Sequence, residues 1–343
     1  MNKDQSAVRA LPRAGAHAAA PQRLSRLCPE HDPLTLPAPR RQNHLRVNIA
    51  ALGDVGASLL LGLRLLGGAL IDRIGIYDLD PNTILRYEAE MNQIGWPFST
   101  HPLPEVAPVA ENEIFDCDLF IFCATKAVPP LGSGGDVRML QFEANRRIAA
   151  HYGQLAKAAG YQGLFAVVSD PVDPLCKEVL LSSGLAPAQI RGYGLGVMNK
   201  RAEYYAKKDA RFADYLTEGR AFGPHGADLV IANSIEHYDD ALSRELTDLT
   251  VKANLAIREL RVRELGFKPY LAPAFSSGAI SLLLTLQGEW HYSSVYFGKG
   301  ADGAFLGLRN RLSAEQVEYE DLLLPPALYA RIEHAYHNLC ALI

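Results

Sequence analysis

The stretch LRVNIAALGDVGASLLLGLRLLGGALIDRIGIYDL, residues 45–79, decides the fold. It begins with a β-branched, apolar run at 45–52, turns through a glycine-containing segment into an amphipathic run of helix length, and ends in a second apolar run at 71–79. Two apolar strands joined by a helix form a unit whose strands pair in parallel. The stretch therefore predicts the start of a parallel sheet with helices on its faces.

The same alternation continues along the chain. We expect a helix that begins with proline at 81–94, a third strand at 115–125, a long helix at 137–160 and a fourth strand at 163–171. Apolar strands that alternate with helices indicate a parallel sheet covered on both faces. The predicted fold class is therefore α/β, with a Rossmann-like, doubly wound sheet that binds ligands at the carboxyl ends of its strands.

The turn after the first strand carries the glycines Gly53 and Gly56. Backbone amides at such a turn, with the positive end of the following helix, hold a pyrophosphate. Ala51 stands where the G-x-G-x-x-G pattern has its first glycine, and Asp54 adds a negative charge near the expected phosphates. Asp78, at the end of the second strand, is placed to accept hydrogen bonds from a ribose and to repel a 2′-phosphate. The combination favours NAD as the cofactor, and the alternative is a purely structural turn.

Composition narrows the class of partner. The 343 residues are 48% hydrophobic and carry a formal net charge of -4, with a pI near 6.2. This balance gives no basic surface for nucleic acid or an anionic membrane, so we expect a small-molecule substrate. The five cysteines form no C-x-x-C pair, which favours reduced thiols in the cytoplasm. No apolar run reaches the ~18 residues of a spanning helix.

The first 44 residues differ from the remainder. They are rich in Ala, Pro and Arg and contain no continuous apolar segment, so an ordinary secretory signal is excluded. We expect residues 1–44 to be a disordered extension, with an organelle transit peptide as the alternative. The rest divides into an NAD-binding Rossmann domain at 45–191 and an α+β substrate domain at 192–343.

Five further segments resemble those of the lactate/malate dehydrogenase family, and they occur in the same order as in that family. The likeness extends over about residues 45–285. The matching segments are VRMLQFEAN at 137–145, VVSDPVDPL at 167–175, GYGLGVMNKR at 192–201, FGPHG at 222–226 and FSSGAI at 275–280.

The resemblance implies hydride transfer between a nicotinamide and a small 2-hydroxy or 2-oxo compound. His225 matches the proton donor, a role that suits an imidazole because it titrates near neutral pH. Arg201 matches the arginine that forks onto the substrate carboxylate, or is simply a residue of a solvated helix. Arg138 matches the loop arginine that polarises the carbonyl, and Asn145 is assigned to the cofactor site. Ser276 matches a hydroxyl near the substrate, or else caps a helix.

Three positions depart from the family pattern. Met198 stands where the family has the aspartate that accepts the second N–H of the histidine, and Asn199 beside it is uncharged. Asp170 replaces the amide of N-P-V-D. We expect burial to favour its protonated form, which would donate to the carbonyl, take over the acid/base role, or select a cationic or hydroxyl-bearing substrate. Gly132, at the position that selects the substrate, supplies no second arginine for a dicarboxylate, so malate is disfavoured.

Two functions follow as hypotheses. The first is an NAD-dependent oxidoreductase acting on a CH–OH group, in a homodimer or homotetramer as the family implies. The second is a catalytically degenerate NAD-binding sensor or regulatory protein on the same scaffold, which Met198 and Asp54 favour. The NAD-dependent glycosidases share this architecture, but the sequence has no recognisable metal-binding pattern of Cys and His.

Overall fold

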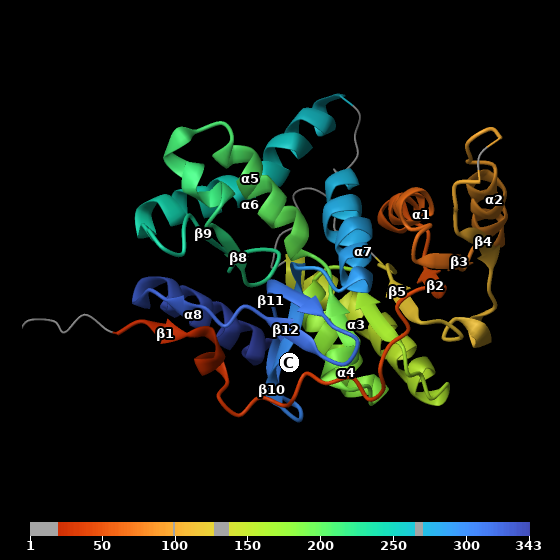
Figure 1. The fold of residues 1–343 in the computed structure, drawn as a ribbon, viewed down its shortest axis with the longest axis horizontal. Coiled ribbons are helices and arrows are strands. Elements are labelled where there is room, and N and C mark those ends of the chain that lie inside the picture. Colours follow the sequence, from red (N-terminus) through yellow and green to blue (C-terminus); the bar gives the residue numbers. More distant parts are fainter. Residues whose placement is uncertain (1–19, 99, 127–136, 265–269) are drawn as a thin grey trace, which may run out of the picture.

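The fold is built on a nine-stranded sheet that crosses most of the molecule (Figure 1). The computed structural model describes residues 20–98, 100–126, 137–264 and 270–343. Within these residues, six strands form a parallel group. They are β2 (Leu45–Ala50), β3 (Ile71–Tyr77), β4 (Glu105–Pro108), β5 (Leu119–Phe122), β6 (Leu164–Val167) and β7 (Ile190–Gly192).

The parallel strands follow the doubly wound order. Counted along the chain they lie side by side as 3-2-1-4-5-6, with the change of direction between β2 and β5. Right-handed crossovers then place α1 (Asp54–Leu66) and α2 (Pro81–Asn92) on one face and α3 (Val137–Ala158) and α4 (Val172–Ser183) on the other. The predicted Rossmann-like fold class is confirmed, and it places the ligand crevice at the carboxyl ends of β2 and β5.

The central strands are buried on both faces, which explains why their sequences are continuously apolar instead of alternating. Every residue of LFIF in β5 and of LFAV in β6 is buried. Ile49, Ile121 and Phe165 have no exposed surface. Each such side chain contributes about 1.5–3 kcal/mol to stability relative to an exposed one. This core holds the strand ends, and the loops that follow them, in fixed positions.

The sheet continues beyond the parallel group through antiparallel strands from the C-terminal part of the chain. Ser294 of β10 pairs with Gly192 of β7, and β11 and β12 follow. The expected border at 191/192 therefore falls inside β7, and the sheet itself crosses it. The three antiparallel strands are β10 (His291–Lys299), β11 (Asp302–Leu312) and β12 (Val317–Tyr319).

A smaller lobe packs beside the sheet around a second hydrophobic cluster, which includes Met198, Phe212 and Leu246. It consists of α5 (Leu195–Ala206), η4 (Ala210–Leu216), β8 (Arg220–Phe222), β9 (Val230–Ala232) and α6 (Asp240–Glu264). The other helical segments are η1 (Leu24–Leu27), η2 (Glu111–Glu113), η3 (Pro187–Gln189), the π-helical η5 (Pro273–Ala279), α7 (Ile280–Gln287) and α8 (Pro326–Leu342). None of the helices in the described ranges is long and apolar enough to cross a membrane.

The segment before the first parallel strand packs onto the fold. β1 (Gln22–Arg23) pairs antiparallel with β13 (Leu323–Leu324), and Leu24 is fully buried. Further along, the amide of Val317 donates to the carbonyl of Leu34 at 2.8 Å. The expectation of a disordered extension is therefore wrong for residues 20–44, because their partners lie some 300 residues later in the chain. Residues 1–19 lie outside the described residues.

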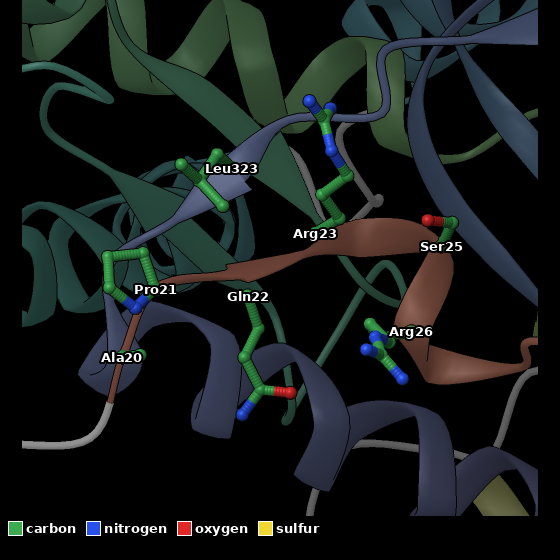
Figure 2. A pocket seen from close by; sticks show the side chains of 7 residues that line it. All are labelled: Ala20, Pro21, Gln22, Arg23, Ser25, Arg26 and Leu323. Atoms are coloured by element: carbon green, nitrogen blue, oxygen red, sulfur yellow. The ribbon is translucent and has the colours of Figure 1, made fainter.

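A hollow of about 470 Å³ lies beside β1 (Figure 2). Arg23, which lines it, donates from its guanidinium to the backbone carbonyl of Asp321 at 3.0 Å. None of the residues that the sequence assigns to the active site lines this hollow. The lining residues are Ala20, Pro21, Gln22, Arg23, Ser25, Arg26 and Leu323.

Candidate active site

The turn between β2 and α1 has the tight geometry that a dinucleotide-binding loop requires. A Cβ atom at Gly56 would lie 2.0 Å from the carbonyl oxygen of Ala51, so only glycine fits there. Gly53 caps α1, and a Cβ there would meet no atom within 4 Å. The backbone at the start of α1 is therefore open to a ligand on one side and closely packed on the other.

Ala51 itself is strained, with φ at 74° in the left-handed region that favours glycine. We expect Ala51→Gly to raise the free energy of unfolding by about 0.5–1 kcal/mol, since relief of strain outweighs the larger entropy of the unfolded chain. Urea unfolding measures this. Ala50→Gly in β2, where no positive φ is relieved, is the matched control and should lose stability. A loss of stability in Ala51→Gly would contradict the interpretation that the backbone at Ala51 is strained.

Asp78 lies at the same edge of the sheet as this turn. Its carboxylate accepts hydrogen bonds from the amide of Leu52 at 2.7 Å and from the amide of Asp80 at 3.0 Å. The side chain is partly exposed, and each oxygen keeps a lone pair. Asp54 is exposed at the first position of α1. The glycines and the strand-end carboxylate thus lie at the same edge of the sheet, and their role in binding a cofactor stays a prediction.

His225 and Asp170 come together from different parts of the chain. His225 lies in the loop between β8 and β9, and Asp170 lies between β6 and α4. Nδ1 of His225 is 3.5 Å from Oδ1 of Asp170, an ion-pair contact when the imidazole is protonated. Nε2 is buried and has no hydrogen-bond partner among the described residues. A Cβ at Gly194 would lie 3.0 Å from Cβ of His225, so the glycine makes room for the histidine.

Arg201 belongs to the same group. It lies on α5, where Nη1 contacts the sulfur of Met198 at 3.6 Å. Burial lowers the pKa of Arg201 to about 10, and the negative charge of Asp170 opposes this shift. Asp170 is therefore close enough to act electrostatically on Arg201 while it contacts His225. A half-desolvated guanidinium of this kind is suited to bind an anion.

The environment of Asp170 differs from the sequence-based expectation. We expected burial to favour its protonated form, but 49% of its side chain is exposed. The buried carboxyl group is that of Asp173, which is 4% exposed and accepts a hydrogen bond from the hydroxyl of Ser294. Burial raises the pKa of Asp173 to about 7, and Ser294 and His225 partly oppose this. The rise in pKa that we expected for a buried carboxyl group is thus found at Asp173, three residues after Asp170 in the same motif.

The raised pKa of Asp173 makes stability depend on pH. An unfolded aspartate has a pKa near 3.9, so between about pH 4 and 7 the folded state binds more protons and loses stability as pH rises. Because asparagine does not ionise, we expect the free energy of unfolding of Asp173→Asn, measured relative to wild type, to rise by about 2 kcal/mol from pH 5 to pH 8. Chemical unfolding across this range measures the difference. Asp228→Asn, from a partly exposed site, is the control, and parallel curves for Asp173→Asn and wild type would contradict the prediction.

Met198, which stands where the family has its aspartate, and Asn199 beside it both contact groups other than His225. Met198 is 4% exposed and packs in the hydrophobic cluster of the smaller lobe. Oδ1 of Asn199 accepts a hydrogen bond from the hydroxyl of Tyr215 at 2.9 Å. The side-chain oxygen of Asn199 therefore already accepts a hydrogen bond from Tyr215. The helix α5 contributes Arg201 to the group around Asp170, but it contributes no carboxylate to that group.

Asn145 supports the site from inside. It is fully buried, and its Nδ2 donates to the backbone carbonyl of Asp170 at 2.8 Å. Its Oδ1 accepts from the amide of Lys126 at 2.9 Å and from Thr125 at 3.3 Å. Asn145 thus joins the loop after β5 to the loop after β6, and its amide is occupied by these contacts.

Ser276 lies within the π-helical segment η5, which is preceded by helical residues, so it is not a helix cap. The serine beside it, which the sequence analysis missed, has a clear structural role. Ser277 accepts from the amide of Val197 and donates to the carbonyl of Gly194, both at 2.8 Å. It therefore fixes the start of α5. Arg138 falls in α3, but its side chain and Gly132 lie outside the described residues.

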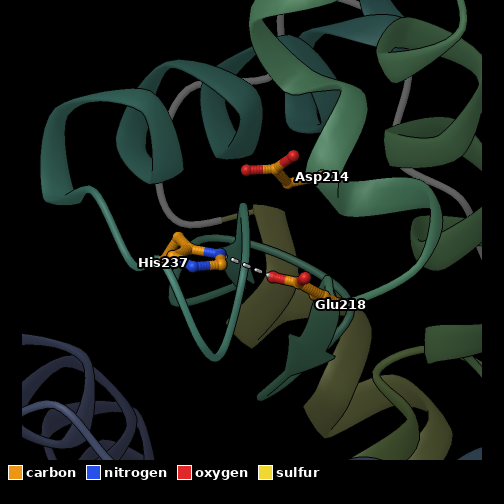
Figure 3. A group of neighbouring side chains, drawn as sticks. All are labelled: Asp214, Glu218 and His237. Carbon is orange, nitrogen blue, oxygen red and sulfur yellow. Dashed lines mark hydrogen bonds and ion pairs between the residues drawn. The ribbon is translucent and has the colours of Figure 1, made fainter.

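One cluster among the described residues has the spacing of a metal site, namely Asp214, Glu218 and His237, whose ligand atoms lie within 4.8 Å of one another (Figure 3). Nδ1 of His237 is 3.3 Å from the carboxylate of Glu218, which also accepts from Ser234. These groups lie at the surface of the smaller lobe, where Glu218 and His237 form an ion-pair contact when the imidazole is protonated. They include none of the residues around His225.

Comparisons with known proteins show what the chain is similar to. No protein-family model matches the chain. The chain is 23% identical over 320 residues to the L-lactate dehydrogenase of Corynebacterium jeikeium, covering 85% of this chain and 94% of that protein. It is 24% identical over 178 residues to the L-lactate dehydrogenase of Staphylococcus saprophyticus, covering 52% and 54% respectively. The alignments thus span only about half the length of several curated relatives.

Solved structures extend the likeness to the whole fold. The minor L-lactate dehydrogenase of Enterococcus mundtii superposes with a TM-score of 0.71 at 20% identity, covering 88% of this chain and 98% of that chain. The malate dehydrogenase of Picrophilus torridus superposes with a TM-score of 0.69 at 16% identity, covering 87% and 95%. Together, the sequence matches and the shared fold fit a divergent member of the lactate/malate dehydrogenase family.

Proposed function

We propose that the protein is an NAD-dependent oxidoreductase that interconverts a small 2-hydroxy acid and the corresponding 2-oxo acid. The observation that carries this proposal is the grouping of an imidazole, a carboxylate and a partly desolvated guanidinium at His225, Asp170 and Arg201. Relatives named as L-lactate dehydrogenases support an NAD-dependent oxidoreductase at the level of the family.

The residues at the carboxyl edge of β2 and β3 fit a dinucleotide. The open side of Gly53 and the unoccupied amides at the start of α1 suit a pyrophosphate, while Gly56 brings the helix close to the strand. The carboxylate of Asp78 suits a ribose diol and opposes a 2′-phosphate, which favours NAD over NADP. When bound, NAD supplies the chemistry of accepting or delivering a hydride.

The side chains around Asp170 then have distinct tasks. Arg201 binds the substrate carboxylate through two parallel N–H donors and so presents the carbonyl carbon in a fixed orientation. His225 gives a proton from Nε2 to the carbonyl oxygen as the carbon gains a hydride, and takes that proton back in the reverse direction. A desolvated site strengthens both interactions. We expect the substrate to be a small molecule and the protein to be a homodimer or homotetramer, as in the family.

A degenerate sensor needs neither a paired imidazole nor a carboxylate-binding arginine. The described residues keep an imidazole beside a carboxylate and a partly desolvated guanidinium, so they do not support this alternative, although Met198 and Asp54 depart from the family pattern.

The test uses the purified full chain. NADH and NADPH are titrated by fluorescence, and NADH oxidation is followed with a panel of 2-oxo acids, together with NAD reduction by the matching 2-hydroxy acids. We expect tighter binding of NADH than of NADPH and turnover of at least one pair. Binding without turnover across the panel would favour the sensor, and absence of binding would contradict both functions.

A further inference from the structure

The carboxylate beside the imidazole of His225 comes from Asp170, between β6 and α4, and not from position 198 on α5, where the family pattern has its aspartate. We infer that Asp170 is the positioning residue of His225, so that the loop between β6 and α4 supplies the carboxylate that α5 does not. This inference rests on the proposed function, because it assigns the group that holds the proton donor. It concerns a residue that acts through the histidine and not on the substrate.

The two ring nitrogens of His225 have different surroundings. Nδ1 faces the carboxylate of Asp170 at 3.5 Å, while Nε2 has no partner within the described part of the chain. A carboxylate beside one nitrogen keeps the proton there and leaves the other nitrogen to exchange a proton with a ligand. The contact therefore fixes the tautomer with hydrogen on Nδ1 and reserves Nε2 for catalysis.

The helix α5 offers no substitute for this carboxylate. Position 198 is a methionine buried in an apolar cluster, and Asn199 binds Tyr215. Among the described residues, the carboxylate that contacts the imidazole is that of Asp170. The negative charge has thus moved from one element to another across the same site.

The surroundings hold Asp170 in place. Asn145 fixes its backbone through the hydrogen bond to its carbonyl oxygen. Among the described residues, the charged and titratable groups that act on the pair include Arg201, whose cation attracts Asp170, and Asp173, whose buried carboxyl group acts on both Asp170 and His225. Because Asp173 is buried and bound to Ser294, it does not replace Asp170 at Nδ1.

The first experiment moves the carboxylate back. Asp170→Asn removes the charge at constant size and is expected to lower kcat/KM by about 10²- to 10⁴-fold, as loss of an orienting aspartate does elsewhere. Adding Met198→Asp in the same chain should recover at least about tenfold, while Met198→Asp alone should bring no gain. Asp170→Glu, which keeps the charge, should retain more activity than Asp170→Asn. Asp228→Asn removes a charge from the loop of His225 and is expected to stay near wild type.

The second experiment reads the tautomer directly. Nitrogen-15 NMR of histidine-labelled protein reports which ring nitrogen carries hydrogen, and His225→Gln identifies the signal. We expect Nδ1–H in wild type, a mixture of tautomers in Asp170→Asn, and recovery in Asp170→Glu. These measurements need no substrate, so they remain decisive if Met198→Asp disturbs folding or the proposed reaction is wrong. An unchanged tautomer and an unchanged rate in Asp170→Asn would overturn the inference and leave the proposed function standing.

Discussion

Replacing His225 by glutamine is expected to lower kcat/KM by about 10²- to 10⁴-fold, the usual contribution of a positioned general acid or base. Glutamine keeps a polar side chain of similar length, but its amide does not transfer a proton near neutral pH. Binding of NADH should remain, because the residues proposed to hold the dinucleotide lie at the ends of β2 and β3 and not around His225. Steady-state rates with the best 2-oxo acid, and fluorescence titration of the same samples, measure the two effects.

The matched control is His237→Gln. His237 also lies beside a carboxylate, that of Glu218, but at the exposed surface of the smaller lobe. We expect this variant to keep its activity within about twofold, as surface substitutions usually do. If His225→Gln retained the wild-type rate, the proton would have to come from another group and the assignment of Nε2 would be wrong.

The second large effect is expected for Arg201→Lys, which keeps the charge but loses the planar fork. A single ammonium does not form the two parallel bonds that a carboxylate accepts from a guanidinium. We expect a loss of about 3 kcal/mol in binding the transition state, which is roughly a 10²-fold fall in kcat/KM. The loss should appear mainly in KM, because the proposed role of Arg201 is to hold the carboxylate in both the ground state and the transition state.

Arg211→Lys is the control for this substitution. Arg211 forms bidentate contacts with Glu245 at the surface, so the same chemical change there should leave the kinetics unaltered. An Arg201→Lys protein that used 2-oxo acids as well as wild type would show that another group anchors the carboxylate.

The central part of the fold is readable in the sequence because its strands are rich in apolar residues. The four expected strands correspond to β2, β3, β5 and β6. The two missed strands of the parallel group lack a continuous apolar run, because β4 is a partly exposed edge strand and β7 has three residues that include Arg191. Their places in the sheet depend on pairing with neighbours and not on local sequence.

Candidate site residues could be predicted where a local sequence motif resembles one of the family. Contacts between two loops that are distant along the chain could not be predicted. FGPHG and GYGLGVMNKR single out His225 and Arg201 on family resemblance alone. The contact between His225 and Asp170 joins two loops that are distant along the chain, so no local pattern reveals it. The same limit explains why the buried carboxyl group was assigned to Asp170 instead of Asp173, since both follow the same strand.

The segment before β2 has one more consequence. A sheet ends in strands whose outer N–H and C=O groups invite pairing with other molecules. Here the backbone around Thr35 pairs with the residues that lead into β12: the amide of Leu36 donates to the carbonyl of Glu315, and the amide of Val317 donates to the carbonyl of Leu34. The segment therefore covers the start of this edge strand, and a chain that began at residue 45 would leave these backbone groups unpaired.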